Sequence, residues 1–369
     1  MIPAELAAHR LAAQFLTTPG PANASDVVRA LGAVQAQDDA GAKWALSQRT
    51  LRGVTDAEIE HELAAGRTLR THVLRPTWHF VAPEDIRWML ALTAPRVIQF
   101  MSYSNRRLEL DATVVRRSNS AIAKALRDRT YLTRTELRSV LRRARIGAIT
   151  GQRLGHLMML AELEALVCSG PRKGKHFTYA LLDERVPPTT PLERDAALLE
   201  LTRRYFATRG PATVHDFAWW SGLTVADAKR GAQIAGRELE SIEADGKTYW
   251  IATSVPRLSK AKRSAHLLPN YDEYFIGLKD RSAIGARLGD VTAVTGGDAR
   301  IPHVAFVDGQ LVGEWKRLVD GPGAERSSVV VELTVRVVLT AAERRRIAAE
   351  VRRFGEFLGA PVRLREHAG

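Results

Sequence analysis

The chain has 369 residues, of which 45% are hydrophobic, so it can bury a sizeable core and is not a disordered polypeptide. Its formal net charge of +13 favours binding to a polyanion, with nucleic acid the first candidate, although an arginine-rich solvated surface gives the same excess. The single cysteine, Cys168, excludes an intramolecular disulfide and any metal site built from several cysteines. No secretion signal is recognised and no apolar run approaches the ~20 residues of a membrane span, so a cytoplasmic protein is expected.

Helices closed by a pair of strands are predicted in the first part of the chain. The helices are expected at residues 4–16, 26–36, 40–49 and 56–65. Ser25 is predicted to cap the second helix, and Thr55 with Glu58 forms a capping box ahead of the fourth. Two β-type runs, 68–74 and 77–81, follow. Helices followed by a β-hairpin are the make-up of a winged helix.

The same order recurs twice further along the chain. Helices are expected at 118–129, 134–144 and 151–166 before strands at 166–169 and 176–182, and again at 192–208, 214–220 and 225–235 before strands at 239–244 and 248–252. A basic turn, Gly170–Lys175, joins the second pair of strands, and Asp245-Gly246-Lys247 joins the third. Because the hairpins lie about 75–100 residues apart, the chain is predicted to contain three tandem helical modules, each closed by a wing.

Beyond residue 260 the pattern becomes rich in β-strand. Strands are expected at 264–268, 303–307, 310–317 and 327–339, and a last helix at 340–358. Residues 187–191, rich in proline, are the clearest linker. The expected domains are 1–115, 116–190 and 191–258, which are the three winged modules, and 259–369, a mixed α/β closing unit.

Two glutamines, Gln35 and Gln37, lie beside two carboxylates, Asp38 and Asp39, that could act as acid or base. Glutamine does not titrate, but its side chain offers both an acceptor and two donor hydrogens, which suits an orienting role. On an intact helix, residues two apart point roughly 200° away from each other, so the helix must stop near Ala36 if both amides serve one site. On the spacing alone, two ordinary solvent-facing residues at a helix end are the simpler explanation of the pair.

Other catalytic motifs are scarce. The chain has no glycine-rich phosphate loop, no dinucleotide fingerprint and no His-Glu-x-x-His run. Nucleotide hydrolysis and nicotinamide chemistry are therefore not expected, and neither is a metal or a cofactor. His72 and His79 are interpreted as structural histidines.

Basic residues of the predicted modules favour double-stranded DNA as the partner. A winged helix presents one helix to a groove, while its wing contacts the backbone or the minor groove. Each of these cations alone is an ordinary surface residue, but together they indicate a basic track. The candidates are Arg153 in the second module, Lys229 and Arg230 in the third, and Arg172, Lys173 and Lys175 in the basic turn.

Several motifs resemble the AlkZ/YcaQ-like family of bacterial winged-helix DNA glycosylases. In chain order they are Leu31–Asp38, Arg75–Val81, Leu267–Tyr274 with Asp280–Ser282, and Val307–Trp315. The resemblance covers nearly the whole chain. It implies three winged helices around a basic cleft, and excision of N7-alkylated purines, with some members unhooking azinomycin-type interstrand crosslinks. We therefore predict an α+β fold of three tandem winged helix-turn-helix modules in a C-shaped arrangement, with the C-terminal closing unit.

The family's catalytic signature is glutamine, an apolar residue, then glutamine or aspartate. Gln35-Ala36-Gln37 resembles the form found in self-resistance enzymes of antibiotic producers, which implies that Gln35 and Gln37 are catalytic. Gln37 is expected to hold the attacking water and Gln35 to orient it or the sugar, with exchanged roles as the alternative. The family also depends on a hairpin that probes DNA. The candidates are the turn Asp308-Gly309-Gln310 and the basic turn of the second module.

The main alternative is a non-enzymatic DNA-binding regulator, because winged helices serve mostly that purpose. Three modules in one chain favour a monomer over the dimer typical of regulators. A bifunctional lyase would need a desolvated lysine near the sugar, and no sequence feature marks one. The sequence thus predicts a monofunctional, monomeric glycosylase acting on duplex DNA that bears alkylated purines or crosslinks, and it leaves the preferred adduct open.

Overall fold

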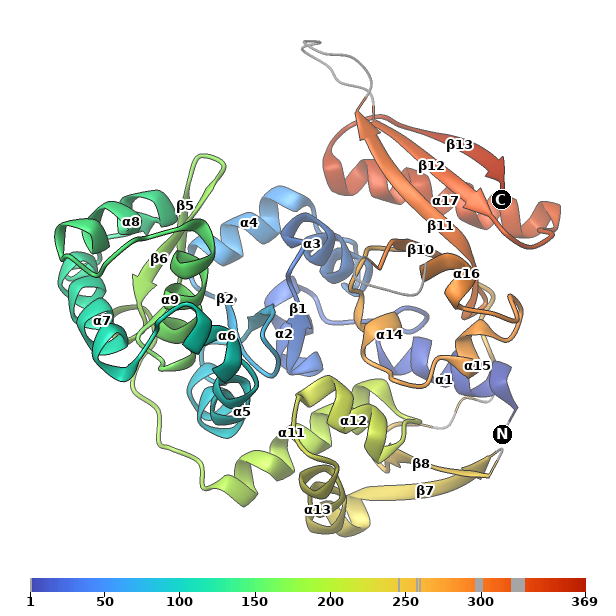
Figure 1. Cartoon of the computed structure of the whole chain (residues 1–369). Coiled ribbons are helices and arrows are strands. Elements are labelled where there is room, and N and C mark those ends of the chain that lie inside the picture. The colour runs from blue at the N-terminus through green and yellow to red at the C-terminus, as the bar shows by residue number, and fades with distance from the viewer. Residues whose placement is uncertain (1, 245, 257, 259, 296–300, 320–328) are drawn as a thin grey trace.

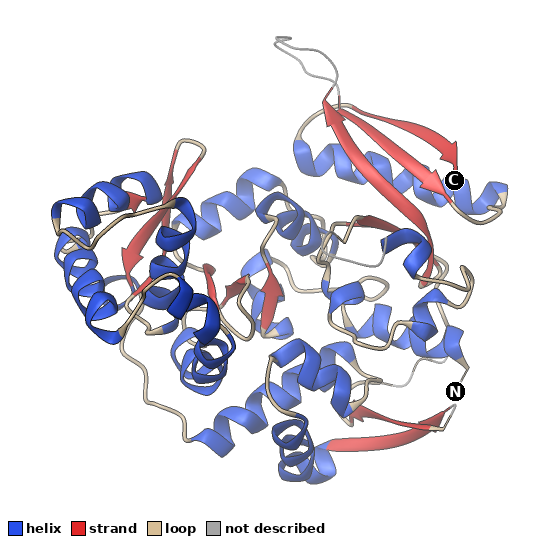
Figure 2. Cartoon of the chain, in the orientation of Figure 1, coloured by secondary structure: helices blue, strands red, loops and turns tan. Residues whose placement is uncertain are grey.

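The computed structural model describes residues 2–244, 246–256, 258, 260–295, 301–319 and 329–369. It has the α+β fold expected from the sequence, with small separate sheets among many helices (Figure 2). Figure 1 shows the N-terminal elements α2, α3 and β1 in the middle, with the chain's later parts arranged around them. Within the described residues, no helix is long and apolar enough to cross a membrane.

The first unit contains the candidate glutamines. Its elements are α1 (Pro3–Ala13), α2 (Ala24–Leu31), β1 (Ala33–Gln35), α3 (Asp39–Gln48), α4 (Asp56–Ala64), β2 (Leu69–His72) and β3 (Trp78–Val81). The three strands form an antiparallel sheet in the order β1-β3-β2, in which Gln35 lies opposite His79. The capping box of Thr55 and Glu58 is present at the start of α4, as predicted.

The second helix is shorter than predicted. It is capped by Asn23 rather than Ser25, and it ends at Gly32, whose φ of +79° suits glycine and stops the helix. The prediction of helix up to Ala36 was therefore wrong, because residues 33–35 form β1 and the Ala36 N–H donates to the Trp78 carbonyl (2.7 Å). Because the helix ends at Leu31 and Gln35 lies on a strand, the two glutamines are not held on opposite sides of a helix.

Two linking helices and the second unit follow. They are α5 (Ile86–Phe100), α6 (Ser102–Arg107), α7 (Ala112–Leu126), β4 (Leu132–Thr133), α8 (Arg134–Arg143), α9 (Gly151–Leu163), β5 (Val167–Lys173), β6 (His176–Leu181) and α10 (Leu182–Arg185). Helices α5 and α6 were not predicted, and α5 contains Pro95, a residue that sequence rules count against a helix interior. Strand β5 is longer than predicted, so Arg172 and Lys173 lie on the strand, and only Gly174 and Lys175 form the turn.

The third unit repeats the order of the first two. Its elements are α11 (Arg194–Arg209), α12 (Val214–Ser221), α13 (Val225–Ala235), the 3₁₀ helix η1 (Gly236–Glu238), β7 (Leu239–Ala244) and β8 (Lys247–Ala252). A bridge between Ala212 and Trp250 takes the place of the short first strand. The predicted turn at this hairpin begins at Asp245, which lies outside the described residues. Each unit therefore runs helix, strand or bridge, two helices and a hairpin. The helices followed by a hairpin were expected from the sequence, whereas the strand or bridge after the first helix was not.

The C-terminal unit is a five-stranded sheet packed against one long helix. Its elements are β9 (Ala265–Leu268), α14 (Glu273–Ile276), α15 (Ser282–Gly285), α16 (Thr292–Thr295), β10 (His303–Val307), β11 (Gln310–Val319), β12 (Val329–Val335), α17 (Ala341–Leu358) and β13 (Val362–Ala368). The order is β13-β12-β11-β10-β9, with only β12 and β13 parallel among the described pairs. Strand β13 was not predicted, and residues 327 and 328 of the predicted strand 327–339 lie outside the described residues.

The sheet of the first unit is buried between its neighbours. Val81 of β3 packs in one apolar cluster with Tyr205 of the third unit, while the next residue back, Phe80, packs in a second cluster with Trp315 and Phe354 of the C-terminal unit. Full burial of each such side chain stabilises the fold by about 1.5–3 kcal/mol. Strand β3 is thus fixed from both faces, and it holds β1 and Gln35 in place through its ladder.

Candidate active site

Gln35 and Gln37 occupy different environments at the end of β1. The Gln35 side chain is almost fully buried, with 6% of the residue exposed, and its Oε1 accepts a hydrogen bond from Arg75 Nη2 (2.7 Å). Gln37 is exposed in the loop before α3, and no described residue makes a hydrogen bond with its side chain. One amide is therefore fixed by the protein and the other is free to bind a ligand.

Arg75 determines which end of the Gln35 amide faces the site. A guanidinium donates hydrogen bonds and accepts none, so the carbonyl oxygen of Gln35 must point toward it and the NH₂ group is left for a ligand. The loop that carries Arg75 joins β2 to β3 and packs against the third unit, where a Cβ on Gly222 would come within 2.1 Å of the Leu74 carbonyl oxygen. Contact between the two units therefore holds Arg75 beside Gln35.

A buried ion pair holds the main chain of β1. Glu273 accepts from the Gln35 N–H (2.8 Å), from Arg209 Nη2 (2.5 Å) and from Trp220 Nε1 (2.8 Å). Arg209 also donates to the carbonyl oxygens of Leu31 (2.8 Å) and Ala33 (3.0 Å). Burial raises the pKa of Glu273, but the charge and hydrogen bonds of Arg209 outweigh it and the pKa is lowered overall. An ionised carboxylate from the C-terminal unit and an arginine from the third unit thus fix the strand that carries Gln35.

His79 lies opposite Gln35 in the sheet and is fully buried. Its Nδ1 contacts the Thr77 carbonyl oxygen (3.0 Å), and its Nε2 has no partner within the described chain. Burial, with a smaller effect of Arg75, lowers the pKa of His79 to about 3, so this imidazole is neutral at physiological pH. It cannot supply a proton to a leaving group at that pH.

The two aspartates after Gln37 have structural partners. Asp38 caps α3, because its Oδ1 accepts from the Gly41 N–H (3.2 Å). Asp39 pairs with Arg172 of the second unit, and burial raises the pKa of this carboxyl despite that arginine. Among the described atoms around Asp39, none donates a hydrogen bond to Oδ1, which is buried.

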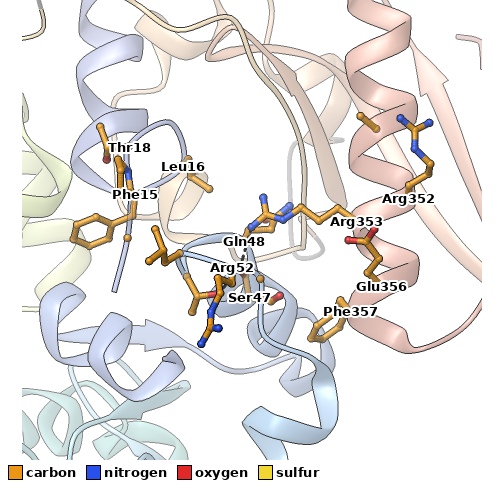
Figure 3. A pocket seen from close by; sticks show the side chains of 16 residues that line it. Phe15, Leu16, Thr18, Ser47, Gln48, Arg52, Arg352, Arg353, Glu356 and Phe357 are labelled. Atoms are coloured by element: carbon orange, nitrogen blue, oxygen red, sulfur yellow. Dashed lines mark hydrogen bonds between the residues drawn. The ribbon is translucent and has the colours of Figure 1, made fainter. Parts of the chain in front are cut away.

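An apolar pocket of about 510 Å³ lies beside Arg75. Its lining comes from the β2–β3 loop, α5 and α12: Leu74, Arg75, Pro76, Arg96, Val97, Gln99, Phe100, Trp219 and Gly222. A second, more polar pocket of about 420 Å³ lies at the far end of α3, where Arg353 donates to the Ser47 carbonyl oxygen (3.1 Å) (Figure 3). None of the residues predicted to be functional lines that second pocket.

Comparison with known proteins identifies the family. The model of the family described as DNA glycosylase AlkZ-like matches residues 28–357. The chain belongs to the AlkZ-like DNA glycosylases. An interstrand DNA cross-link repair glycosylase from Streptomyces sahachiroi is 25% identical to this glycosylase over an alignment of 329 residues. The match covers 84% of this chain and 86% of the relative. The solved structure of Streptomyces sahachiroi DNA glycosylase AlkZ matches the fold with a TM-score of 0.81 over 100% of both chains, at 22% identity.

Membership of the AlkZ-like family makes the chain an enzyme that acts on DNA, rather than a non-enzymatic regulator. Within the described residues of this glycosylase, no group of three or more histidine, cysteine, aspartate and glutamate side chains is placed to hold a metal ion.

The basic residues predicted to contact DNA differ in their exposure and in whether they form ion pairs within the protein. Arg172 forms ion pairs with Asp39 and with Glu60 (2.9 Å), so its positive charge is already balanced within the glycosylase. Lys173 is about half exposed and lies 3.2 Å from Glu136, while Lys175 is exposed at the tip of the wing. The wing therefore presents lysines to solvent and directs its arginine inward.

The predicted groove-helix cations of the AlkZ-like glycosylase are not gathered into one site. The Arg153 side chain is 11% exposed and packs against Glu109 and the Ile146 carbonyl, which is a structural position. Lys229 and Arg230 lie on α13 and are exposed, with Arg230 paired to Asp195 (2.5 Å). Helix α13 and the wing of the second unit lie far apart (Figure 1).

The turn Asp308-Gly309-Gln310 is packed against other parts of the glycosylase. Asp308 accepts from Arg263 (2.8 Å) and Arg346 (3.3 Å), Gly309 is buried, and Gln310 donates to the Ala283 carbonyl (2.9 Å). These contacts leave the turn little freedom to enter a duplex. Of the two hairpins considered from the sequence, the wing that carries Lys173 and Lys175 is the one that reaches solvent.

Sequence reasoning missed the residues that hold the glutamines. Arg75 and Glu273 lie within the motifs that carry the family resemblance, but their local sequence assigns them no role. Arg209 lies in no motif. Arg75 and Glu273 contact Gln35 directly, whereas Arg209 pairs with Glu273. Glu273 is 238 residues from Gln35, and no local pattern encodes such a contact.

Proposed function

We propose that this chain is a monofunctional DNA glycosylase that hydrolyses the N-glycosidic bond of N7-alkylated guanine and related purines, including those joined in interstrand crosslinks. The observation that carries the proposal is the pair of uncharged amides at the end of β1, one fixed by Arg75 and one free. The printed description of the Streptomyces sahachiroi relative as a cross-link repair glycosylase supports extending the substrate to crosslinks. The three repeated units are proposed to be winged-helix modules with the boundaries predicted from the sequence.

The chemistry requires no acid. Alkylation at N7 makes the purine cationic, so the C1′–N9 bond breaks with its electron pair moving to the ring and neutralising that charge. The sugar becomes an oxocarbenium-like centre that water attacks at C1′, and the water's proton passes to solvent. A neutral His79 and two amides that do not titrate suit a reaction in which the leaving base is not protonated.

The two glutamines are proposed to have different roles. Gln37, with both ends of its amide free, accepts a hydrogen bond from the attacking water and holds it near C1′. Gln35 presents only N–H groups, because Arg75 occupies its oxygen, and donates to the water or to a sugar oxygen. The polarity of Gln35 thus favours Gln37 as the holder of the water.

The partner is proposed to be duplex DNA bound by one copy of the chain. Lys173, Lys175 and Lys229 are the proposed phosphate contacts, because their side chains reach solvent. The buried lysine of α3, Lys43, pairs with Asp56 (2.9 Å) and Glu60 (3.1 Å). Although burial lowers its pKa, these carboxylates raise the pKa of Lys43 overall, so it stays protonated and does not suit a lyase nucleophile.

The test uses duplexes that carry 7-methylguanine, a defined interstrand crosslink or a bulky N7 adduct, each scored for abasic sites after alkali. Gln35→Ala and Gln37→Ala should each abolish excision while leaving DNA affinity within about fivefold. Excision at the wild-type rate by either variant would disprove its assignment. Borohydride trapping of a covalent enzyme–DNA product would disprove the monofunctional mechanism.

A further inference from the structure

Four side chains from two units stack alternately behind the candidate active site. Arg70 of β2 lies 4.4 Å from the ring centroid of Trp78 in β3 and 4.5 Å from that of Phe177 in β6. The guanidinium of Arg172 in β5 lies 3.9 Å from the centroid of the same Phe177 ring. These four residues are called the arginine–aromatic stack below. Strands β2 and β5 contact each other, and the Arg70 N–H donates to Ser169 Oγ (2.8 Å).

The stack reaches the peptide between the two glutamines. Arg70 Nε donates to the Ala36 carbonyl oxygen (3.0 Å), and the Ala36 N–H donates to the Trp78 carbonyl (2.7 Å). Because the Ala36 carbonyl belongs to the peptide that precedes Gln37, its hydrogen bond determines where the backbone of Gln37 begins. A guanidinium covered by a ring on each side moves mainly in its own plane, so the direction of this hydrogen bond is fixed.

The stack does not compete for the space that a substrate would use. In the sheet register Gln35 pairs with His79, whereas Arg70 pairs with Phe80, so Arg70 and Gln35 belong to opposite faces. The loop is tied to the second unit a second time through the ion pair of Asp39 with Arg172. The segment from Ala36 to Asp39, which contains Gln37, is therefore held at both ends by the same stack.

We propose that Arg70 is a positioning residue for Gln37 and that Phe177, in the wing of the second unit, is required to keep Arg70 in place. The wing of the second unit thereby completes the active site of the first. This inference rests on the proposed role of Gln37 in water attack. It assigns to the wing a task separate from DNA contact.

The experiment measures single-turnover excision of 7-methylguanine and the DNA dissociation constant for the full chain. Phe177 is 38% exposed, so Phe177→Ala should fold. Its excision rate should fall about tenfold while its dissociation constant stays within about twofold, because a displacement of about 1 Å at a reacting group costs up to about a hundredfold. Phe177→Trp keeps a ring over Arg70 and should restore the rate to within about threefold of wild type.

Arg70→Lys keeps the charge but loses the planar Nε–H, and its rate should fall at least as far as that of Phe177→Ala. The matched control is Tyr103→Ala, which removes an exposed ring that lies 5.9 Å from the Arg107 guanidinium but belongs to α6. This control should match the wild type in both measurements.

The outcomes separate this inference from the proposed function. If the wild-type chain releases no base from any of the adducts, the proposed function fails. If the wild type is active and Phe177→Ala is equally fast, or if Phe177→Trp is as slow as Phe177→Ala, the inference fails while the proposed function stands. A change in DNA affinity without a change in single-turnover rate would also overturn it, because the wing would then act only in binding.

Discussion

Arg75 donates a hydrogen bond to the side-chain oxygen of Gln35 across 2.7 Å, and it thereby fixes the polarity of an amide that has no charge of its own. The arginine comes from the loop between β2 and β3, and the glutamine from β1 of the same sheet. In consequence, Gln35 offers a ligand only hydrogen-bond donors, whereas Gln37 offers both a donor and an acceptor. The two glutamines of the motif are chemically alike but are not equivalent in the fold.

Replacing Arg75 should slow excision without removing either glutamine. In Arg75→Ala the Gln35 amide is free to rotate, and we expect the single-turnover rate on 7-methylguanine to fall about 10- to 100-fold. The control is Arg96→Ala, which removes another arginine that lines the same pocket. An Arg75→Ala rate equal to that of Arg96→Ala would show that the orientation of Gln35 does not matter.

Glutamate substitutions should separate the roles of the two glutamines. Gln35→Glu replaces the donor NH₂ by an acceptor and forms an ion pair with Arg75, so it should be as inactive as Gln35→Ala. Gln37→Glu keeps an acceptor for the water and should retain at least about tenfold more activity than Gln37→Ala. The measurement is single-turnover excision at pH 7. The reverse order, with Gln35→Glu the more active variant, would assign the water to Gln35.

Breaking the buried pair of Glu273 and Arg209 should destabilise the fold. Glu273→Gln leaves the Arg209 charge buried without a counter-charge, and we expect the free energy of unfolding to fall by about 3–5 kcal/mol in a urea titration. Glu366→Gln, which breaks the surface pair with Arg344, should leave the urea midpoint unchanged. A Glu273→Gln midpoint equal to that of Glu366→Gln would contradict the structural role of the buried pair.

Local signals in the sequence were sufficient for most of the fold. The helices predicted to begin at residues 56, 134 and 214 begin there. In the structure each start has a capping box, at Thr55, Thr133 and Thr213, which satisfies main-chain donors within one turn. Strand β1 was missed because its structure depends on a distant contact. The apolar spacing before Gln35 fits a helix, and only its pairing with β3, about 45 residues later, makes it a strand.

The candidate site was only half predictable. Gln35 and Gln37 stand out because of the family motif, but their fixed geometry comes from residues far away in the sequence. Arg70 contacts Ala36 from 34 positions later, and its second ring, Phe177, belongs to another unit. Such contacts depend on the packing of units against each other, which periodicity and capping do not encode.

The pH dependence of stability should reveal two buried neutral histidines. Burial lowers the pKa of His266 and of His79 to about 3, while an unfolded chain binds these protons near pH 6.5. Stability is therefore fully present above about pH 6.5 and is lost as the pH falls toward 3, by about 1.4 kcal/mol per pH unit for each histidine. His266→Leu should remove about half of that slope between pH 6 and 5 in urea titrations. His176→Leu, at an exposed position, should keep the wild-type slope.

The salt dependence of DNA binding should distinguish cations that face DNA from those used within the fold. Lys175 is exposed at the tip of the wing, so Lys175→Ala should weaken binding to any duplex and lower the slope of log affinity against log salt by about 0.9. Arg153 is packed against Glu109 and Ile146, so Arg153→Ala should lower stability and leave the slope unchanged. Fluorescence anisotropy with an undamaged duplex at several salt concentrations measures both slopes. An unchanged slope in Lys175→Ala would show that Lys175 does not contact a phosphate.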